Sequence, residues 1–246
     1  MRLSMAATHR VLAVIFASMV LGGVAWAEPS SLNCELIASP PPMATFGGPA
    51  TASPGRTELG IGVGGYGELP PTPCFHGGGT DWFVRWRRGV SQHIDLGFDL
   101  VTDNQTDGSL GATVKVAIRY QVNKGFRLEA GLGAADQGDG QSANADVAAT
   151  IGTNNPNQTW NYYTSLHLAG SRGCSNPFCV GQKGTDHLPG AVVPLGVIGS
   201  TARVSENTHF VMEAGLGGIF SQEHPGPGVY LHLAFGVLFD VGRKRK

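Results

Sequence analysis

Serine, histidine and aspartate occur in a pattern that could support acyl transfer. Ser165 and His167 are two residues apart in an alternating stretch, 160–169, so they share one face of a strand. Asp146 lies in the preceding alternating stretch, where it could orient the histidine of a nucleophile, base and carboxylate arrangement. The spacing matches no diagnostic motif, however, and a structural histidine inside a polar interior fits it better. We therefore expect no enzyme activity and keep an envelope lipid or ester hydrolase as an alternative.

The four cysteines indicate an oxidising compartment. Cys174 and Cys179 stand close together in Cys-Ser-Asn-Pro-Phe-Cys and predict a local disulfide in the longest loop. Cys34 and Cys74 form a possible second pair, although three pairings are formally open. Joining them requires the segment before the first strand to thread the interior, and residues 35–56 are long enough at roughly 3.3 Å per residue.

The sequence gives little support for a metal, a cofactor or a nucleic-acid partner. Zinc bound by Cys174, Cys179 and His187 would lack a recognised ligand spacing, so we expect no metal and no cofactor. Without residues 1–27, which hold two of the 17 Lys and Arg and none of the 18 acids, the chain has 15 basic and 18 acidic residues, a net charge of −3. That balance, without a basic stripe, argues against nucleic acid. The basic tail, 242–246, is expected to be solvated.

The N-terminal part divides into a leader and a lead-in. Arg2 and Arg10 form a positive region before an apolar stretch, 11–24, that is shorter than the about 20 residues of a spanning helix. Ala25-Trp26-Ala27 then provides a cleavage pattern, so residues 1–27 are predicted to be a signal peptide that directs export. Residues 28–56 are rich in Pro and Gly and have no periodicity, which predicts an extended lead-in or a plug.

From residue 57 to 241 the pattern changes to stretches of about ten residues in which apolar and small or polar side chains alternate. The clearest is 229–241, because its period of two persists over the whole stretch. The sequence predicts ten strands, over 59–66, 82–88, 94–100, 113–120, 126–133, 144–152, 160–169, 191–204, 210–217 and 229–241. The sixth is rich in Ala and the eighth contains Pro194, so both are expected to be short or irregular, and eight strands is the alternative.

If the apolar face points outward, the other face places charged and polar side chains of both signs inside: Arg85, Arg87, Asp95, Asp99, Lys115, Arg119, Arg127, Glu129, Asp146, His167, Glu213 and His232. Buried charges need partners, so we expect a salt-bridge network that fills a ten-stranded lumen. The alternative is a narrow charge-lined pore. Inward glycines such as Gly131 and Gly215 favour some free volume and keep that alternative open.

Short connections alternate with mostly longer ones along this part of the chain, which is typical of transmembrane barrels. On this layout and on the alternating strands, residues 57–241 resemble the small outer-membrane β-barrel proteins of Gram-negative bacteria. The resemblance implies an all-β, closed antiparallel transmembrane barrel in the cell outer membrane, with outer-membrane lipid and the barrel-assembly machinery as partners. The chain lacks the terminal aromatic residue typical of such proteins, because Phe239 is followed by Asp-Val-Gly and the tail.

We expect a non-enzymatic envelope role, structural or surface-binding, with an unknown surface ligand. A narrow diffusion pore is the first alternative. A rival fold is a soluble secreted β-sandwich, in which the apolar faces of two sheets would meet in a core.

Overall fold

The computed structural model describes residues 45–69, 79–105, 110–136, 141–155, 157–174, 190–221 and 228–242. The predicted signal peptide, the start of the lead-in, residues 243–246 of the tail, Cys34, Cys74, Cys179 and His187 lie outside these ranges, as does the side chain of Cys174. Both disulfides and the zinc alternative therefore stay predictions. In the described part of the chain, no helix is long and apolar enough to cross a membrane.

Strands make up most of the described residues, because the apolar and polar positions alternate over longer stretches than the sequence pattern alone marked. The ten strands, between 11 and 16 residues long, are β1 (Thr57–Leu69), β2 (Gly79–Gly89), β3 (Ile94–Gln105), β4 (Leu110–Asn123), β5 (Phe126–Asp136), β6 (Gln141–Gly152), β7 (Trp160–Cys174), β8 (Gly190–Ser205), β9 (Thr208–Ser221) and β10 (Gly228–Val241).

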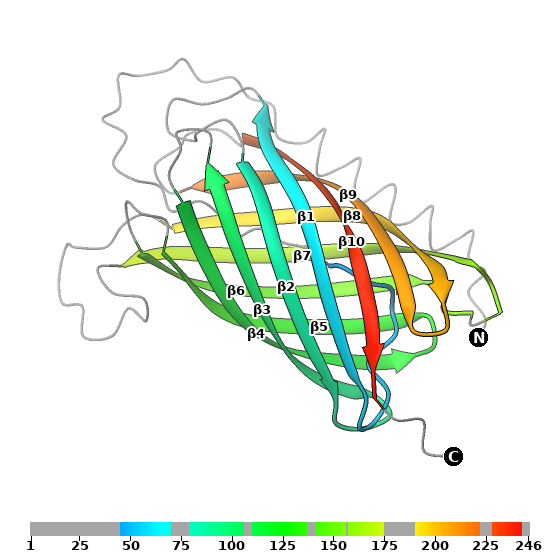
Figure 1. The fold of residues 1–246 in the computed structure, drawn as a ribbon. Coiled ribbons are helices and arrows are strands. Elements are labelled where there is room, and N and C mark those ends of the chain that lie inside the picture. The colour runs from blue at the N-terminus through cyan, green and yellow to red at the C-terminus, as the bar shows by residue number, and fades with distance from the viewer. Residues whose placement is uncertain are drawn as a thin grey trace, which may run out of the picture.

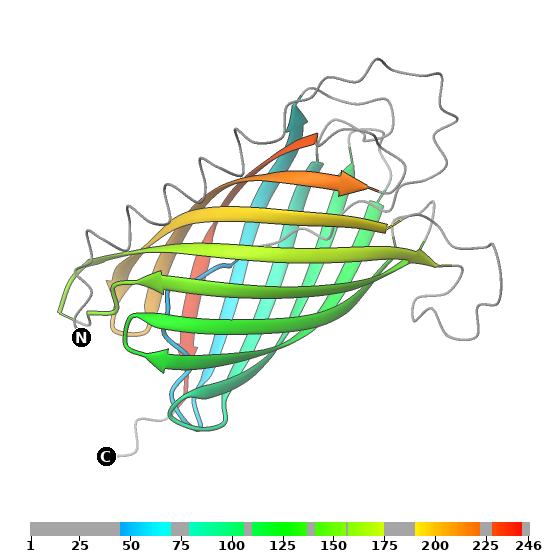
Figure 2. The same cartoon turned by 180° about the vertical axis from the view of Figure 1, so that it is seen from behind.

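Each strand pairs antiparallel with its neighbours in sequence, and β1 pairs with β10 to close the barrel. Thr57 lies opposite Val241 and Leu69 opposite Val229, so the closing pair is in register along all of β1. Figures 1 and 2 show β10, β1 and β2 in one wall and β5 to β8 in the opposite wall. The closed order confirms the ten-stranded barrel, and the β-sandwich is wrong because it would need two separate sheets.

The two strands that were expected to be short or irregular are complete, so the eight-stranded alternative is wrong. β6 pairs with β7 along its whole length despite its alanines. In β8, Pro194 still lies opposite Leu168 of β7, whereas Val193 and Pro194 have no register partner in β9. Proline lacks the amide hydrogen that a strand donates to its neighbour. The missing hydrogen bond falls at this interruption between β8 and β9, so the rest of the pairing is kept.

The connections separate into two rims. The turn rim holds the links 90–93, 124–125, 153–159 and 206–207, and the loop rim holds 70–78, 106–109, 137–140, 175–189 and 222–227. Two loop-rim links contain only four residues, because the adjoining strands extend further toward that rim than their sequence pattern indicated.

The alternation puts apolar side chains on the outside of the barrel. Leu132 is 65% exposed and Ile198 67% exposed, and exposed large apolar residues occur on every strand. Inward-facing charged residues, by contrast, are buried: Arg87, Asp95 and Arg127 have no exposed surface. This distribution is the reverse of the usual one, in which apolar residues are inside and ionised residues are rarely buried.

Residues 45–56, here called the inner segment, run inside the barrel from the turn rim toward its middle (Figure 1). Pro54 bridges to Gly89 at the end of β2. The amide of Ala52 donates to Asp95 of β3, and Thr45 reaches His167, midway along β7. Thr45 and Phe46 are fully buried.

Candidate functional site

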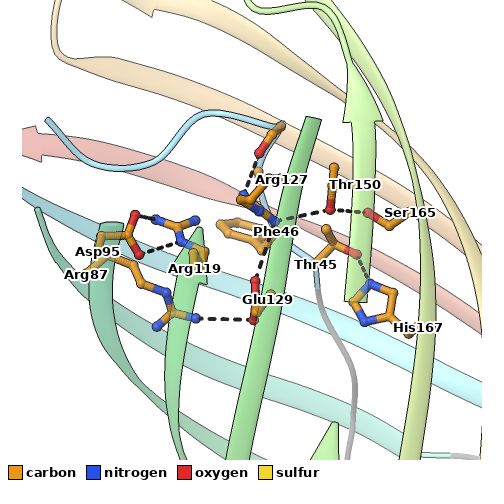
Figure 3. A network of polar contacts seen from close by, with 12 residues as sticks. Thr45, Phe46, Arg87, Asp95, Arg119, Arg127, Glu129, Thr150, Ser165 and His167 are labelled. Atoms are coloured by element: carbon orange, nitrogen blue, oxygen red, sulfur yellow. Dashed lines mark hydrogen bonds and ion pairs between the residues drawn. The ribbon is translucent and has the colours of Figure 1, made fainter. Parts of the chain in front are cut away.

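The barrel lumen is the candidate site. The structure places all twelve charged or polar residues singled out from the sequence on the inward face. Eleven of them are buried, and the Lys115 side chain is 17% exposed. Strand alternation alone positions them, because a residue and its second neighbour always face the same side. Figure 3 shows several of them converging from different strands.

Asp99 of β3 lies at the centre of the larger ion-pair group. Its Oδ1 accepts a hydrogen bond from Arg85 Nε at 3.0 Å and from Arg87 Nη1 at 2.6 Å. Lys115 Nζ lies 3.7 Å from Asp99 Oδ2 and 3.2 Å from Asp146 Oδ1. Asp99 is therefore shared by three cations, which pair a buried carboxylate in the way that a low-dielectric interior requires.

Glu129 of β5 connects this group to the next strand. Its Oε1 lies 3.5 Å from Lys115 Nζ and 3.9 Å from Arg87 Nη2, and its Oε2 lies 3.5 Å from Arg127 Nη2. A second group joins Arg119 to two carboxylates, Asp95 at 2.7 Å and Glu58 at 3.3 Å. Together the two groups contain five cations and five carboxylates: Arg85, Arg87, Lys115, Arg119 and Arg127, with Glu58, Asp95, Asp99, Glu129 and Asp146.

Inward glycines make room for these side chains, and at Gly131, where free volume was expected, a charged side chain takes that room. A Cβ at Gly97 would lie 2.2 Å from Arg87 Cδ, and one at Gly131 would lie 2.5 Å from Asp146 Oδ1. Both distances are well below van der Waals contact. At Gly97 and Gly131 a neighbouring charged side chain therefore occupies the space that a Cβ would need.

The inner segment contacts this wall mainly through its main chain. Arg85 Nη1 donates to the carbonyl oxygens of Thr45, at 2.5 Å, and Phe46, at 2.8 Å. Arg127 Nη1 donates to the carbonyls of Gly48 and Ala50. In the opposite sense, amides of the segment donate to the wall: Gly47 to Tyr163 Oη at 3.2 Å, Thr51 to Gln121 Oε1 at 3.5 Å and Ala52 to Asp95 Oδ2 at 2.8 Å.

One side chain of the segment, Phe46, packs deeply into the wall. It joins the buried cluster of Phe83, Val101, Val211, Ala234 and Leu238. Its ring meets Phe83 edge-on with centroids 4.5 Å apart, and the Arg85 guanidinium lies 6.0 Å from its centroid. A Cβ at Gly236 would lie 2.3 Å from Phe46 Cζ, so a larger residue there would occupy the place of the ring.

Apolar side chains fill the lumen on its other side. Val193, Leu195 and Val197 of β8 form a buried cluster with Ala169, Ile219 and Tyr230. The Tyr66 and Tyr230 rings stack against each other, 5.8 Å apart. The lumen therefore combines an ion-paired wall, an apolar wall and the inner segment.

The structure does not join Ser165, His167 and Asp146 to one another through the hydrogen bonds of the described residues. Ser165 Oγ lies 2.7 Å from Thr150 Oγ1, His167 Nε2 contacts the Thr45 hydroxyl, and Asp146 pairs with Lys115. Figure 3 shows Ser165 and His167 engaged with these different partners. Within the described ranges, no three His, Cys, Asp or Glu residues gather into a metal site.

Sequence reasoning missed the residues of the inner segment that touch the wall. Phe46 was the available signal, since a lone aromatic residue in a Pro- and Gly-rich stretch needs an apolar contact. Tyr163 was also missed. Its hydroxyl donates to Glu213 Oε1 and accepts the Gly47 amide, so it links the wall to the segment.

No protein-family model matches this chain, and no curated protein matches it. Among solved structures, it is similar to the translocator domain of the autotransporter NalP from Neisseria meningitidis, with 10% identity, a TM-score of 0.41, and coverage of 96% of this chain and 97% of that one. It is also similar to the outer membrane protease OmpT from Escherichia coli (7% identity, TM-score 0.40, coverage of 81% and 99%). A third is the outer membrane protein OprG from Pseudomonas aeruginosa (10% identity, TM-score 0.35, coverage of 80% and 100%). Two of these structures are outer-membrane proteins and the third is a translocator domain.

Proposed function

We propose that this chain spans the outer membrane as a barrel whose lumen is closed by its own side chains and inner segment. It then has a non-enzymatic envelope role, either structural or surface-binding, with the loop rim facing outward. The observation that carries the proposal is the reversed burial: apolar side chains cover the outside, while ion pairs and the inner segment fill the inside.

The outer face supports a lipid environment on energetic grounds. Thirty large apolar side chains are exposed among the described residues. At about half exposure, their contact with water would cost roughly 20 to 45 kcal/mol at about 1.5 to 3 kcal/mol for each full side chain. Lipid around this face would remove that cost, so a lipid environment fits it better than water.

The dimensions support the same environment. Strands of 11 to 16 residues, at about 3.3 Å per residue and a tilt of about 40°, rise roughly 28 to 40 Å. A bilayer core is about 30 Å thick. Exposed aromatic residues lie near the turn rim at Trp86, Trp160 and Tyr162, where an interfacial aromatic girdle is expected.

The filled lumen favours a closed barrel over a diffusion pore. An ion crossing it would have to pass the Asp99 group and the inner segment, and both are held by several hydrogen bonds. The hydrolase alternative has less support, because Ser165 and His167 each have a different hydrogen-bond partner.

Membrane fractionation combined with gel mobility of boiled and unboiled samples tests the proposal. The natively produced protein should appear in the outer-membrane fraction, and its band should shift on boiling as the closed barrel unfolds. A periplasmic band without a shift would contradict the proposal. Assays of ester and phospholipid hydrolysis on the same preparation should give no activity above that of a Ser165→Ala variant.

A further inference from the structure

The lumen wall has the features of a binding site that recognises an extended peptide. At least five side chains of the wall form hydrogen bonds with the inner segment's main chain, among them Arg85, Arg127, Asp95, Tyr163 and Gln121. Of these five, Arg85 and Arg127 donate to carbonyl oxygens, and the other three accept from amides. Main-chain hydrogen bonds of this kind give affinity with little dependence on the peptide's sequence, and a side-chain pocket then adds selectivity.

Four of these groups are also held by the wall itself, so their positions do not depend on the segment. Arg85 uses Nε and Nη2 for Asp99 and keeps Nη1 for the segment. Arg119 holds both oxygens of Asp95, whose Oδ2 also accepts the Ala52 amide. Arg127 Nη2 lies near Glu129, and Tyr163 donates to Glu213. A site organised in advance binds with a smaller loss of conformational entropy.

The selective element is the Phe46 pocket. The buried residues of the pocket come from β2, β3, β9 and β10, and Gly60 of β1 lies next to the ring, whereas Gly48, Ala50 and Thr51 of the inner segment contact β4 and β5. Phe46 has a φ of 37°, a left-handed backbone conformation that is unfavourable for a bulky residue. The conformation is maintained because the pocket and the main-chain contacts together compensate for its strain.

We propose that the lumen contains a preformed site for an extended peptide with one aromatic side chain followed by small residues, and that the inner segment is its resident intramolecular ligand. A peptide of the same chemistry binds in trans when the resident segment loses its anchor. In the intact chain the tethered segment competes at an effective concentration of about millimolar, so added peptide is excluded.

The test uses a fluorescein-labelled peptide with the sequence of residues 45–53, Thr-Phe-Gly-Gly-Pro-Ala-Thr-Ala-Ser, and the full-length Phe46→Asp variant in detergent micelles. Fluorescence anisotropy should show saturable binding to this variant, at least tenfold tighter than to the unaltered protein. Replacing Phe by Ala in the peptide should weaken binding by about tenfold to a hundredfold, which corresponds to the burial of one aromatic side chain.

Gly60→Ala in the Phe46→Asp background provides a matched control on the pocket. Its Cβ would lie 2.9 Å from Leu238 Cδ2 and 3.3 Å from Phe46 Cε1, so it narrows the pocket, and no backbone atom is among its nearest neighbours. This double variant should bind the peptide several-fold more weakly. The proposal would be overturned if the unaltered protein or the Gly60→Ala double variant bound the peptide as tightly as the Phe46→Asp variant does. It would also be overturned if the Phe-to-Ala peptide bound as tightly as the original peptide, or if no saturable binding were seen.

Phe46→Ala replaces Phe46→Asp if the latter does not give a heat-modifiable band. If neither variant forms a closed barrel, the proposal is also contradicted, because the site would then not exist without its resident segment. The proposal goes beyond the envelope role. If the folded, membrane-inserted barrel binds no peptide, the peptide site is contradicted and the envelope role is not. If the protein proves to be soluble, the envelope role is contradicted and the peptide site is not.

Discussion

Asp99→Ala should strongly destabilise the barrel. The Asp99 side chain is only 8% exposed and lies near three cations, with the closest contact 2.6 Å from Arg87 Nη1. Removing the carboxylate leaves Arg85, Arg87 and Lys115 in the interior with one counter-charge fewer. Breaking a buried ion pair on one side costs about 3 to 5 kcal/mol, because the remaining charge is left uncompensated. We expect a loss of stability in that range.

Asp240→Ala is the matched control. It removes the same side chain from a pair with Arg56 that is 3.9 Å long, with side chains 31% and 26% exposed. Exposed pairs contribute about 0 to 1 kcal/mol, so this variant should be nearly as stable as the unaltered protein.

Urea unfolding of both variants in lipid vesicles, followed by tryptophan fluorescence, gives the free energies of unfolding by linear extrapolation. A difference below about 1 kcal/mol between Asp99→Ala and Asp240→Ala would refute the reasoning. Adding Arg87→Met to Asp99→Ala should cost less than the two single substitutions together, because it removes one of the cations left behind.

Three further predictions concern the packing at Gly97, the lipid-facing surface and the absence of hydrolase activity. Gly97→Ala should destabilise the barrel by about 1 to 3 kcal/mol in the same urea assay, since its Cβ would overlap the Arg87 side chain; an unchanged midpoint would mean that Arg87 lies elsewhere. Leu132→Arg should cost about 2 to 4 kcal/mol of folding free energy in vesicles, because Leu132 is exposed near the middle of β5 where lipid is proposed; Leu132→Ala is the control, and equal stability of the two would argue against lipid at this face. Ser165→Ala should leave ester hydrolysis at the level of buffer, and a measurable activity that this substitution abolishes would restore the hydrolase alternative.

Much of the fold was predictable because strand alternation is a local property of the chain. In 229–241 and 113–120 the period of two already indicates which residues share a side of the sheet, and the inward position of Arg85 or Glu129 follows from that alternation alone. Pro194 misled the prediction because only the register of β8 against β9 shows that the missing amide falls at a tolerated interruption.

The filling of the lumen was less predictable, because it depends on which strands face each other across the barrel. The pairing of Asp99 with Arg85 follows from the β2–β3 register, in which the two are direct partners. The contact between Phe46 and Leu238 joins residues from opposite ends of the chain, and no local pattern encodes it. The inward glycines suggested empty space, and only the positions of Arg87 and Phe46 show that this space is occupied.

Planar-bilayer recording of the purified full-length protein tests the central claim, a membrane-spanning barrel closed by its own chain. Insertion is verified on vesicles of the same lipid by resistance of the strands to added protease. The account predicts inserted protein with no unitary current steps over the baseline of the bare bilayer. Regular single-channel steps from inserted, heat-modifiable protein would contradict it, because they would require an open path past the Asp99 group and the inner segment.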